Sequence, residues 1–398
     1  MAAAPASAGR PRFDIADIVR QHRAALEAET RLTLAQRRVL SAIEVCRTAA
    51  LGGHVDVCRA CGYEHPFYDS CRNRHCPKCQ ALTQERWIAA RAERLLETRH
   101  FHAVFTLPSE LRGLAKFRPR EIFDALFAAA SETLLELGQS RLDAQLGVTM
   151  VLHTWARDLH THPHVHAIVT AGGLGADHQH WVRASAKYLF PVQVMGKLLR
   201  GKMMAALRRL HARGAFARFH DFADPEGFER LMTRLGRHGR WHVYVKKPFR
   251  EVRHVLRYLG RYTHRVAISA SRLVAVSDHS VTFRTKDGKC VTLSPVEFLR
   301  RFVQHVLPDG FHKIRHYGLY AGAAQATLTL ARDVLAGTRH TPTTSSVTTP
   351  APSSSSWPEL LLAVTGRDVT RCPRCGAPLD RVPVPRASAR APPERAVA

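Results

Sequence analysis

The sequence contains no apolar run close to the roughly 18 residues that a membrane-spanning helix needs. Its first ten residues are rich in alanine but lack the continuous apolar segment of a secretion signal. No segment recurs at the regular period of a solenoid repeat protein. These absences argue against an integral membrane protein, a secreted precursor and a repeat array. We expect a soluble, cytoplasmic chain.

Acidic side chains are also scarce, because 33 Asp and Glu stand against 59 Lys and Arg. The formal net charge is +26, and the excess positive side chains repel one another in the folded state. A polyanion would neutralise them, so nucleic acid is the expected partner. The hydrophobic content of 45% is that of a globular protein, and the length of 398 residues predicts two or three domains.

Strands alternate with helices in the middle of the chain, which predicts an α+β fold. Apolar and β-branched runs predict strands at 102–107, 148–155 and 164–170. Apolar residues at helical spacing predict helices at 121–137 and 250–262. Gly172 and Gly173 are expected to end the third strand.

Composition divides the chain into four expected parts. They are an N-terminal helical, zinc-binding and DNA-binding module at 1–98, an α+β domain at 99–335, a linker at 336–357 and a short tail at 358–398. The linker is rich in Ser, Thr and Pro and is therefore expected to be disordered. The tail carries a single CxxC pair.

Two CxxC pairs, 14 residues apart, predict one structural zinc site formed by Cys58, Cys61, Cys76 and Cys79. Cysteines in a reducing compartment are more often metal ligands than disulfide partners. Zinc lowers the pKa of thiols, so four thiolates can bind it at neutral pH. Because four thiolates leave no coordination position open, this zinc is expected to be structural rather than catalytic.

Several other residues are open to more than one interpretation. Cys71 and His75 either take part in metal binding or are a surplus thiol and an imidazole that faces a phosphate. Cys372 and Cys375 form only half of a site, because no second pair lies near them in the sequence. The basic residues that suit contacts with a nucleic-acid backbone are Arg72, Arg74 and Lys78.

His164 and His166 form the most informative short motif. Side chains alternate between faces along a strand, so both imidazoles point the same way while Val165 points to the other side. The preceding strand places His153 opposite them if the two strands form an antiparallel hairpin. Three imidazoles leave coordination positions open, as a catalytic metal site needs. The alternatives are a histidine-rich surface turn and, for His153, an ordinary half-buried strand residue.

Tyr258 and Tyr262 lie four residues apart in a predicted helix and therefore share one of its faces. Arg257, Arg261 and Arg265 fall on the side opposite the apolar stripe, where they can hold a phosphate beside the phenols. A hydroxyl anchored between core and basic surface suits a nucleophile. Packing or interface contacts are the alternative interpretation of the two tyrosines.

Together these motifs resemble the two-tyrosine rolling-circle transposases of the insertion sequence 91 type, within the HUH (histidine-hydrophobic-histidine) single-strand nucleases. The resemblance covers most of the chain and rests on segments 71–80, 105–108, 153–155, 162–166, 258–269 and 311–318. It implies an HUH-type antiparallel sheet flanked by helices, with residues 99–335 as the endonuclease and transposase domain.

The resemblance also implies a mechanism. Mg²⁺ or Mn²⁺ on His164 and His166, with His153 similar to the third histidine of conjugative relaxases, would polarise a phosphate of single-stranded DNA at element ends or target. Tyr258 or Tyr262 would attack that phosphate and form a 5′-phosphotyrosine, from which the strand is rejoined without ATP. The chain has no GxxxxGKS or GxxxxGKT phosphate loop, so a host helicase or the replication machinery would supply single strands.

Three other functions share part of this pattern. A plasmid replication initiator or a relaxase would use the same chemistry on different DNA ends. A non-enzymatic zinc-ribbon protein that binds nucleic acid would explain the charge and the CxxC pairs, but not the paired histidines and tyrosines. A hydrolase that activates water at the histidines would nick DNA without becoming linked to it.

Overall fold

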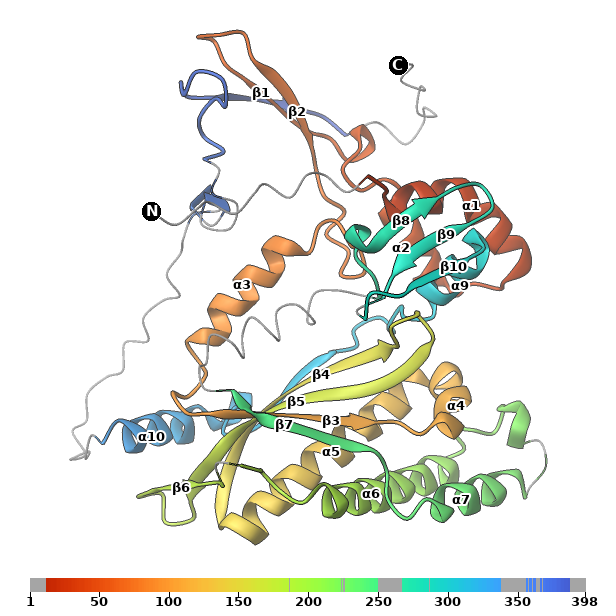
Figure 1. Ribbon diagram of the computed structural model, residues 1–398, viewed down its shortest axis with the longest axis vertical. Helices are drawn as coiled ribbons and strands as arrows, with labels where there is room; N and C mark the ends of the chain where they lie inside the picture. Colours follow the sequence, from red (N-terminus) through yellow and green to blue (C-terminus); the bar gives the residue numbers. More distant parts are fainter. Residues whose placement is uncertain are drawn as a thin grey trace.

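The structure is a computed structural model, drawn in Figure 1. It describes residues 12–185, 187–222, 224, 226–249, 267–285, 287–337, 356, 358–359, 361–362, 366 and 368–386. Within these ranges the chain forms a large antiparallel sheet with helices on both faces, a smaller body of helices and strands, and a separate three-stranded sheet. None of the helices in these ranges has both the length and the apolarity needed to cross a membrane.

The central sheet is antiparallel and has the strand order β11-β4-β5-β3-β7, with β6 added beside β5. Its strands are β3 (His100–Thr106), β4 (Ala144–Trp155), β5 (Thr161–Gly175), β6 (Trp181–Arg183), β7 (Val243–Phe249) and β11 (Ile314–Gly318). The long β4–β5 hairpin lies at its centre (Figure 1). The prediction of an α+β fold with an antiparallel sheet flanked by helices is confirmed.

The expectation that the glycine pair ends the third predicted strand is wrong, because β5 continues through Gly172 and Gly173. A Cβ on Gly173 would lie 2.4 Å from the carbonyl oxygen of Gln145 in β4. A Cβ on Gly172 would lie 2.2 Å from the carbonyl oxygen of Val182 in β6. The two glycines therefore allow β5 to continue between closely spaced neighbours.

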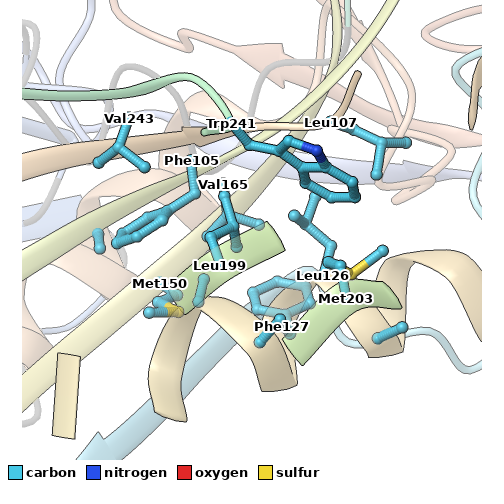
Figure 2. Close-up of a cluster of buried hydrophobic side chains, with 14 of the residues drawn as sticks. Phe105, Leu107, Leu126, Phe127, Met150, Val165, Leu199, Met203, Trp241 and Val243 are labelled. Atoms are coloured by element: carbon cyan, nitrogen blue, oxygen red, sulfur yellow. The ribbon is translucent and has the colours of Figure 1, made fainter. Parts of the chain in front are cut away.

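One face of the central sheet packs against helices and forms the main core (Figure 1). These helices are α4 (Arg112–Phe117), α5 (Pro119–Leu142), α6 (Val192–Ala212) and α7 (Gly227–Arg237). Figure 2 shows Phe105 and Val165 from the strands beside Phe127 of α5 and Leu199 of α6. Burying each such side chain contributes roughly 1.5–3 kcal/mol, so this packing fixes the sheet.

The opposite face of the sheet is covered over part of its length by α3 (Ala81–Ala92) and α10 (Gln325–Ala336). There Val151 and Ile168 of the sheet lie in one apolar cluster with Leu328 of α10. Closer to the turn between β4 and β5, the same face carries histidines instead of apolar residues.

The second body joins the beginning of the chain to a segment more than 200 residues later. Its elements are α1 (Ile15–Glu29), α2 (Leu34–Glu44), β8 (Leu273–Val276), β9 (Val281–Arg284), β10 (Cys290–Leu293) and α9 (Pro295–Val303). Ile18 and Leu40 share one core with Phe283 and Phe298. The N-terminal helices therefore pack against part of the region that the sequence analysis assigns to the α+β domain.

The third sheet brings the tail to the N-terminal hairpin. Its order is β12-β1-β2, with β1 (Gly53–Val57), β2 (Glu64–Tyr68) and β12 (Asp380–Val384). β1 and β12 are antiparallel over their whole length, from the pair of Gly53 with Val384 to the pair of Val57 with Asp380. This part of the tail is therefore a strand of the N-terminal sheet and not a separate segment.

Candidate functional site

Three histidines converge on one face of the central sheet. The register of β4 and β5 pairs His153 with His164, and His166 follows two positions later on the same face. The ligand nitrogens of all three lie within 4.8 Å of one another. Their rings come from two adjacent strands of a packed sheet, so the backbone holds them at this spacing.

The hydrogen bond of His164 determines which of its nitrogens can bind a metal. Its Nδ1 lies 2.7 Å from the carbonyl oxygen of His162. A carbonyl only accepts, so the Nδ1 of His164 carries the proton. The Nε2 atom is then the ligand nitrogen, and the backbone contact orients the ring.

His166 is held by a fourth histidine, His102 of β3, which the sequence analysis misses. The Nδ1 of His166 lies 2.8 Å from the Nε2 of His102, and the two rings stack with centroids 5.0 Å apart. Burial, together with the charges of Lys246 and His164, lowers the pKa of His102 to about 4, so His102 is neutral at pH 7. A neutral His102 can accept the Nδ1 proton of His166, leaving Nε2 of His166 for a metal.

The sequence indicates only that His102 begins the predicted strand at 102–107. This does not say which strands are neighbours. Only the structure shows that β3 lies beside β5 and so brings His102 to His166.

Aromatic side chains and an exposed lysine lie on the same face of the sheet as the histidines. Trp155 stacks on His153 with ring centroids 4.7 Å apart, and His153 is buried. Tyr244 in β7 and His166 in β5 both pair with Val104 of β3, so they share one face of the sheet. The side chain of Tyr244 is 51% exposed, and the exposed Lys246 follows on the same face.

This donor set suits a divalent ion. Among the described residues the group consists of three imidazoles, and three protein ligands leave coordination positions for water and a phosphate oxygen. Imidazole is a softer ligand than carboxylate and favours Mn²⁺ over Mg²⁺.

The predicted nucleophiles and the arginines beside them lie outside the described residues: Tyr258, Tyr262, Arg257, Arg261 and Arg265. The strand that leads to them along the chain is β7, which ends at Phe249. β7 pairs with β3, the strand that carries His102.

Eight of the nine cysteines form two groups of four. The first group is Cys46, Cys71, Cys76 and Cys79. Its sulfur atoms are 3.6 Å apart between Cys46 and Cys76 and 3.7 Å apart between Cys71 and Cys79. A tetrahedral zinc with Zn–S bonds near 2.3 Å needs sulfurs about 3.8 Å apart, so the group fits zinc. Hydrogen bonds from the neighbouring thiols hold the pKa of Cys46 well below its usual range, and the bond from Cys71 has the largest effect.

The expectation that the two early CxxC pairs share one site is wrong. The second group is Cys58, Cys61, Cys372 and Cys375. The first predicted pair therefore faces the tail pair, while the second predicted pair faces Cys46 and Cys71. The sequence analysis assigns Cys46 to no site, but the turn after α2 brings it to the loop that carries the others.

His75 is outside both cysteine groups. It is buried, and its Nε2 accepts a hydrogen bond from the backbone N–H of Leu307 at 3.1 Å. Burial lowers the pKa of His75 to about 3, so the ring stays neutral. In this position His75 is not a ligand of either cysteine group, and its buried ring does not face a phosphate.

Of the three basic residues near the CxxC pairs that are expected to contact DNA, two have partners within the protein. Arg74 donates to the carbonyl oxygens of Phe311 and Pro308 at 2.6 and 2.8 Å. Lys78 forms an ion pair with Asp14. Arg72 is exposed and remains available for a phosphate. Contacts of these three residues with DNA stay a prediction.

Comparison with known proteins gives a consistent result. Residues 147–327 match the family described as "Putative transposase", and residues 18–107 match "Transposase zinc-binding domain". The chain is 40% identical over 379 residues to "Putative transposase y4qJ" of Sinorhizobium fredii, which covers 91% of this chain and 92% of that protein. It is 30% identical over 292 residues to "Transposase for insertion sequence element IS801" of Pseudomonas savastanoi pv. phaseolicola, covering 69% of this chain and 68% of the other. No solved structure gives a significant match.

Proposed function

The chain belongs to the transposases of the insertion sequence 91 type, and from this premise we propose that it nicks and rejoins single-stranded DNA through a 5′-phosphotyrosine. The observation that carries the proposal is the convergence of His153, His164 and His166 on one face of an antiparallel sheet. Membership of the family implies a DNA-processing enzyme; the covalent route is our inference. In the same proposal the sheet is of the HUH type.

His153, His164 and His166 would hold the ion, and the adjacent strands of the sheet fix the positions of these three side chains. A divalent ion bound there, Mg²⁺ or Mn²⁺, supplies Lewis-acid polarisation of the scissile phosphate. The contact of His164 with the carbonyl of His162 and the contact of His166 with His102 keep both rings oriented. These contacts reduce the rearrangement needed when a phosphate arrives.

Tyr258 and Tyr262 are the proposed nucleophiles. The phenol oxygen of one tyrosine attacks the phosphorus, its proton leaves to a base or water, and the bond to the 3′ oxygen breaks. The products are a 5′-phosphotyrosine and a free 3′-hydroxyl, which can later attack the same linkage and rejoin the strand. Two tyrosines allow two such linkages at once, one for each end of a transferred strand. The arginines expected beside them, Arg257, Arg261 and Arg265, would hold the phosphates.

The edge of the sheet supports a role for single-stranded DNA. Tyr244 offers an exposed ring on which a base can stack, and Lys246 adds positive charge two residues later on the same face. The proposed substrates are the ends of the element and a target strand. Because the sequence has no phosphate loop, we propose that a host helicase or the replication machinery exposes these strands.

The proposal is tested by incubating the purified protein with end-labelled single-stranded oligonucleotides and Mn²⁺, followed by denaturing gel electrophoresis. We expect label attached to the polypeptide for the wild type and none for the Tyr258→Phe/Tyr262→Phe double variant. The His164→Ala/His166→Ala variant should lose at least about 100-fold of this activity, as expected when an ion that polarises the phosphate is removed.

Tyr188→Phe is the matched control, because Tyr188 is an exposed tyrosine on the loop before α6. It should keep full activity. Cleavage without protein-linked DNA would show a hydrolase instead. DNA binding without cleavage of any strand, including oligonucleotides from the element ends, would show a zinc-ribbon binding protein. Cleavage restricted to plasmid origins would show a replication initiator or relaxase.

A further inference from the structure

We propose that Cys58, Cys61, Cys372 and Cys375 bind a second structural zinc, which fastens the C-terminal tail to the N-terminal hairpin. The matched zinc-binding family spans residues 18–107 and so contains only half of these ligands. The other half lies 311 residues beyond Cys61.

The spacing of the sulfur atoms fits one tetrahedral zinc. The Sγ atoms of Cys58 and Cys375 are 3.5 Å apart, and those of Cys61 and Cys372 are 3.6 Å apart. All four sulfurs lie within 4.8 Å of one another. Zn–S bonds near 2.3 Å place tetrahedral sulfurs about 3.8 Å apart, so one ion can reach all four with small adjustments.

The two halves of the site have the same local structure. Each is a CxxCG turn, and the glycines, Gly62 and Gly376, have φ angles of 67° and 75°. In each turn the glycine N–H donates to the carbonyl oxygen of the first cysteine at 2.9 Å: Gly62 to Cys58, and Gly376 to Cys372. This repeated turn directs both sulfurs of a pair to the same side, as zinc knuckles require.

The sheet around this site needs a cross-link because it has almost no core of its own. Within the described ranges, no residue of β1, β2 or β12 belongs to any of the three hydrophobic clusters. Phe67, Tyr68 and Val382 are instead exposed large apolar residues. A sheet of this size without a buried core is commonly stabilised by a bound metal.

Charges also favour this pairing of the tail with the hairpin. Asp56 of β1 is only 4% exposed, and the guanidinium of Arg381 in β12 lies 3.1 Å from its carboxylate. At the edge of the sheet, Arg59 contacts Asp380 at 2.5 Å. The tail therefore supplies the cation that neutralises a buried carboxylate, in addition to a strand and two thiolates.

Zinc content tests the proposal directly. The full chain is purified with His164→Ala and His166→Ala in the background, so that the histidines hold no zinc, and bound zinc is measured by mass spectrometry. We expect two zinc ions per chain. Cys372→Ser/Cys375→Ser should keep one, and Cys71→Ser/Cys79→Ser should also keep one, because each variant loses one of two separate sites.

The control is Cys290→Ser, which replaces an exposed cysteine outside both groups and should leave two ions. Cys375→His replaces one zinc ligand by another and should keep the second ion. Retention of the ion in this variant would show that its loss in Cys372→Ser/Cys375→Ser reflects the missing ligands and not misfolding. Co²⁺ substitution adds a spectroscopic check, because the thiolate-to-cobalt absorption of the wild type should fall by about half in the Cys372→Ser/Cys375→Ser variant. One ion in the His164→Ala/His166→Ala parent, or two when Cys372→Ser/Cys375→Ser is added to it, would overturn the proposal. Neither result bears on the phosphotyrosine, which is measured separately.

Discussion

At the scale of single residues, His102 is expected to act through His166. Replacing His102 by Ala removes the acceptor that orients His166. We therefore expect the Mn²⁺ concentration needed for half-maximal activity to rise by about 10- to 100-fold, as is usual when such a partner of a metal ligand is lost. The measurement is the nicking rate as a function of Mn²⁺ concentration. The maximal rate should return at high Mn²⁺, and His102→Gln, whose amide oxygen can accept, should recover part of the affinity.

The matched control is His100→Gln. His100 is a buried histidine of the same strand, but its ring contacts the hydroxyl of Tyr320 and the carbonyl of Thr98 rather than a proposed ligand. It should change stability without changing the Mn²⁺ dependence. An unchanged Mn²⁺ dependence in His102→Ala would contradict the positioning role.

These histidines show what residue-scale patterns reveal and what they omit. The two-residue period of a strand places His164 and His166 on one face, and the short turn after His153 places that residue opposite them. His102 depends on which strand lies next to β5, and no local pattern encodes this. The same reason explains why the sequence indicated neither the partners of Cys46 nor those of Cys372.

At the scale of elements, the course of β5 between β4 and β6 depends on glycine. Gly173→Ala puts a Cβ 2.4 Å from the carbonyl oxygen of Gln145, so a strand has to move. We expect the free energy of unfolding to fall by about 1–3 kcal/mol, the usual effect of overpacking. Denaturant unfolding followed by circular dichroism measures this change.

The control for this change is Gly201→Ala in α6, where an added Cβ would meet nothing within 4 Å. Alanine is a better helix former than glycine, so this variant should gain up to about 1 kcal/mol. Equal stability of the two variants would refute a steric role for Gly173. Gly172 and Gly173 also explain why the predicted end of this strand is wrong. In a sequence, a glycine that forms a turn cannot be distinguished from a glycine that lets two strands approach closely.

At the scale of the whole molecule, buried neutral histidines tie stability to pH. Burial lowers the pKa of His100, His305 and His316 to about 4. In the unfolded chain these groups titrate near 6.5, so between about 6.5 and 4 the unfolded state binds more protons than the folded state. Stability is therefore fully present above 6.5 and is lost as pH falls, by up to roughly 1.4 kcal/mol per histidine per pH unit.

Thermal unfolding between pH 7 and pH 4.5 measures this dependence. We expect the melting temperature to fall steadily below about pH 6.5, near the ordinary histidine pKa. His316→Gln, which removes one of these buried histidines, should give a shallower slope. A melting temperature that stays constant or rises as the solution is acidified would show that these rings are not kept neutral by the fold.

The pairing of β12 with β1 also has a consequence for the order of synthesis. On the ribosome β1 emerges early, whereas Asp380–Val384 follows more than 300 residues later. Until then one edge of β1 has no neighbour from the tail, and Asp56 lacks Arg381. A polypeptide truncated before Asp380 would keep the β1–β2 hairpin but lack the third strand of its sheet, so one edge of β1 would present unpaired backbone groups.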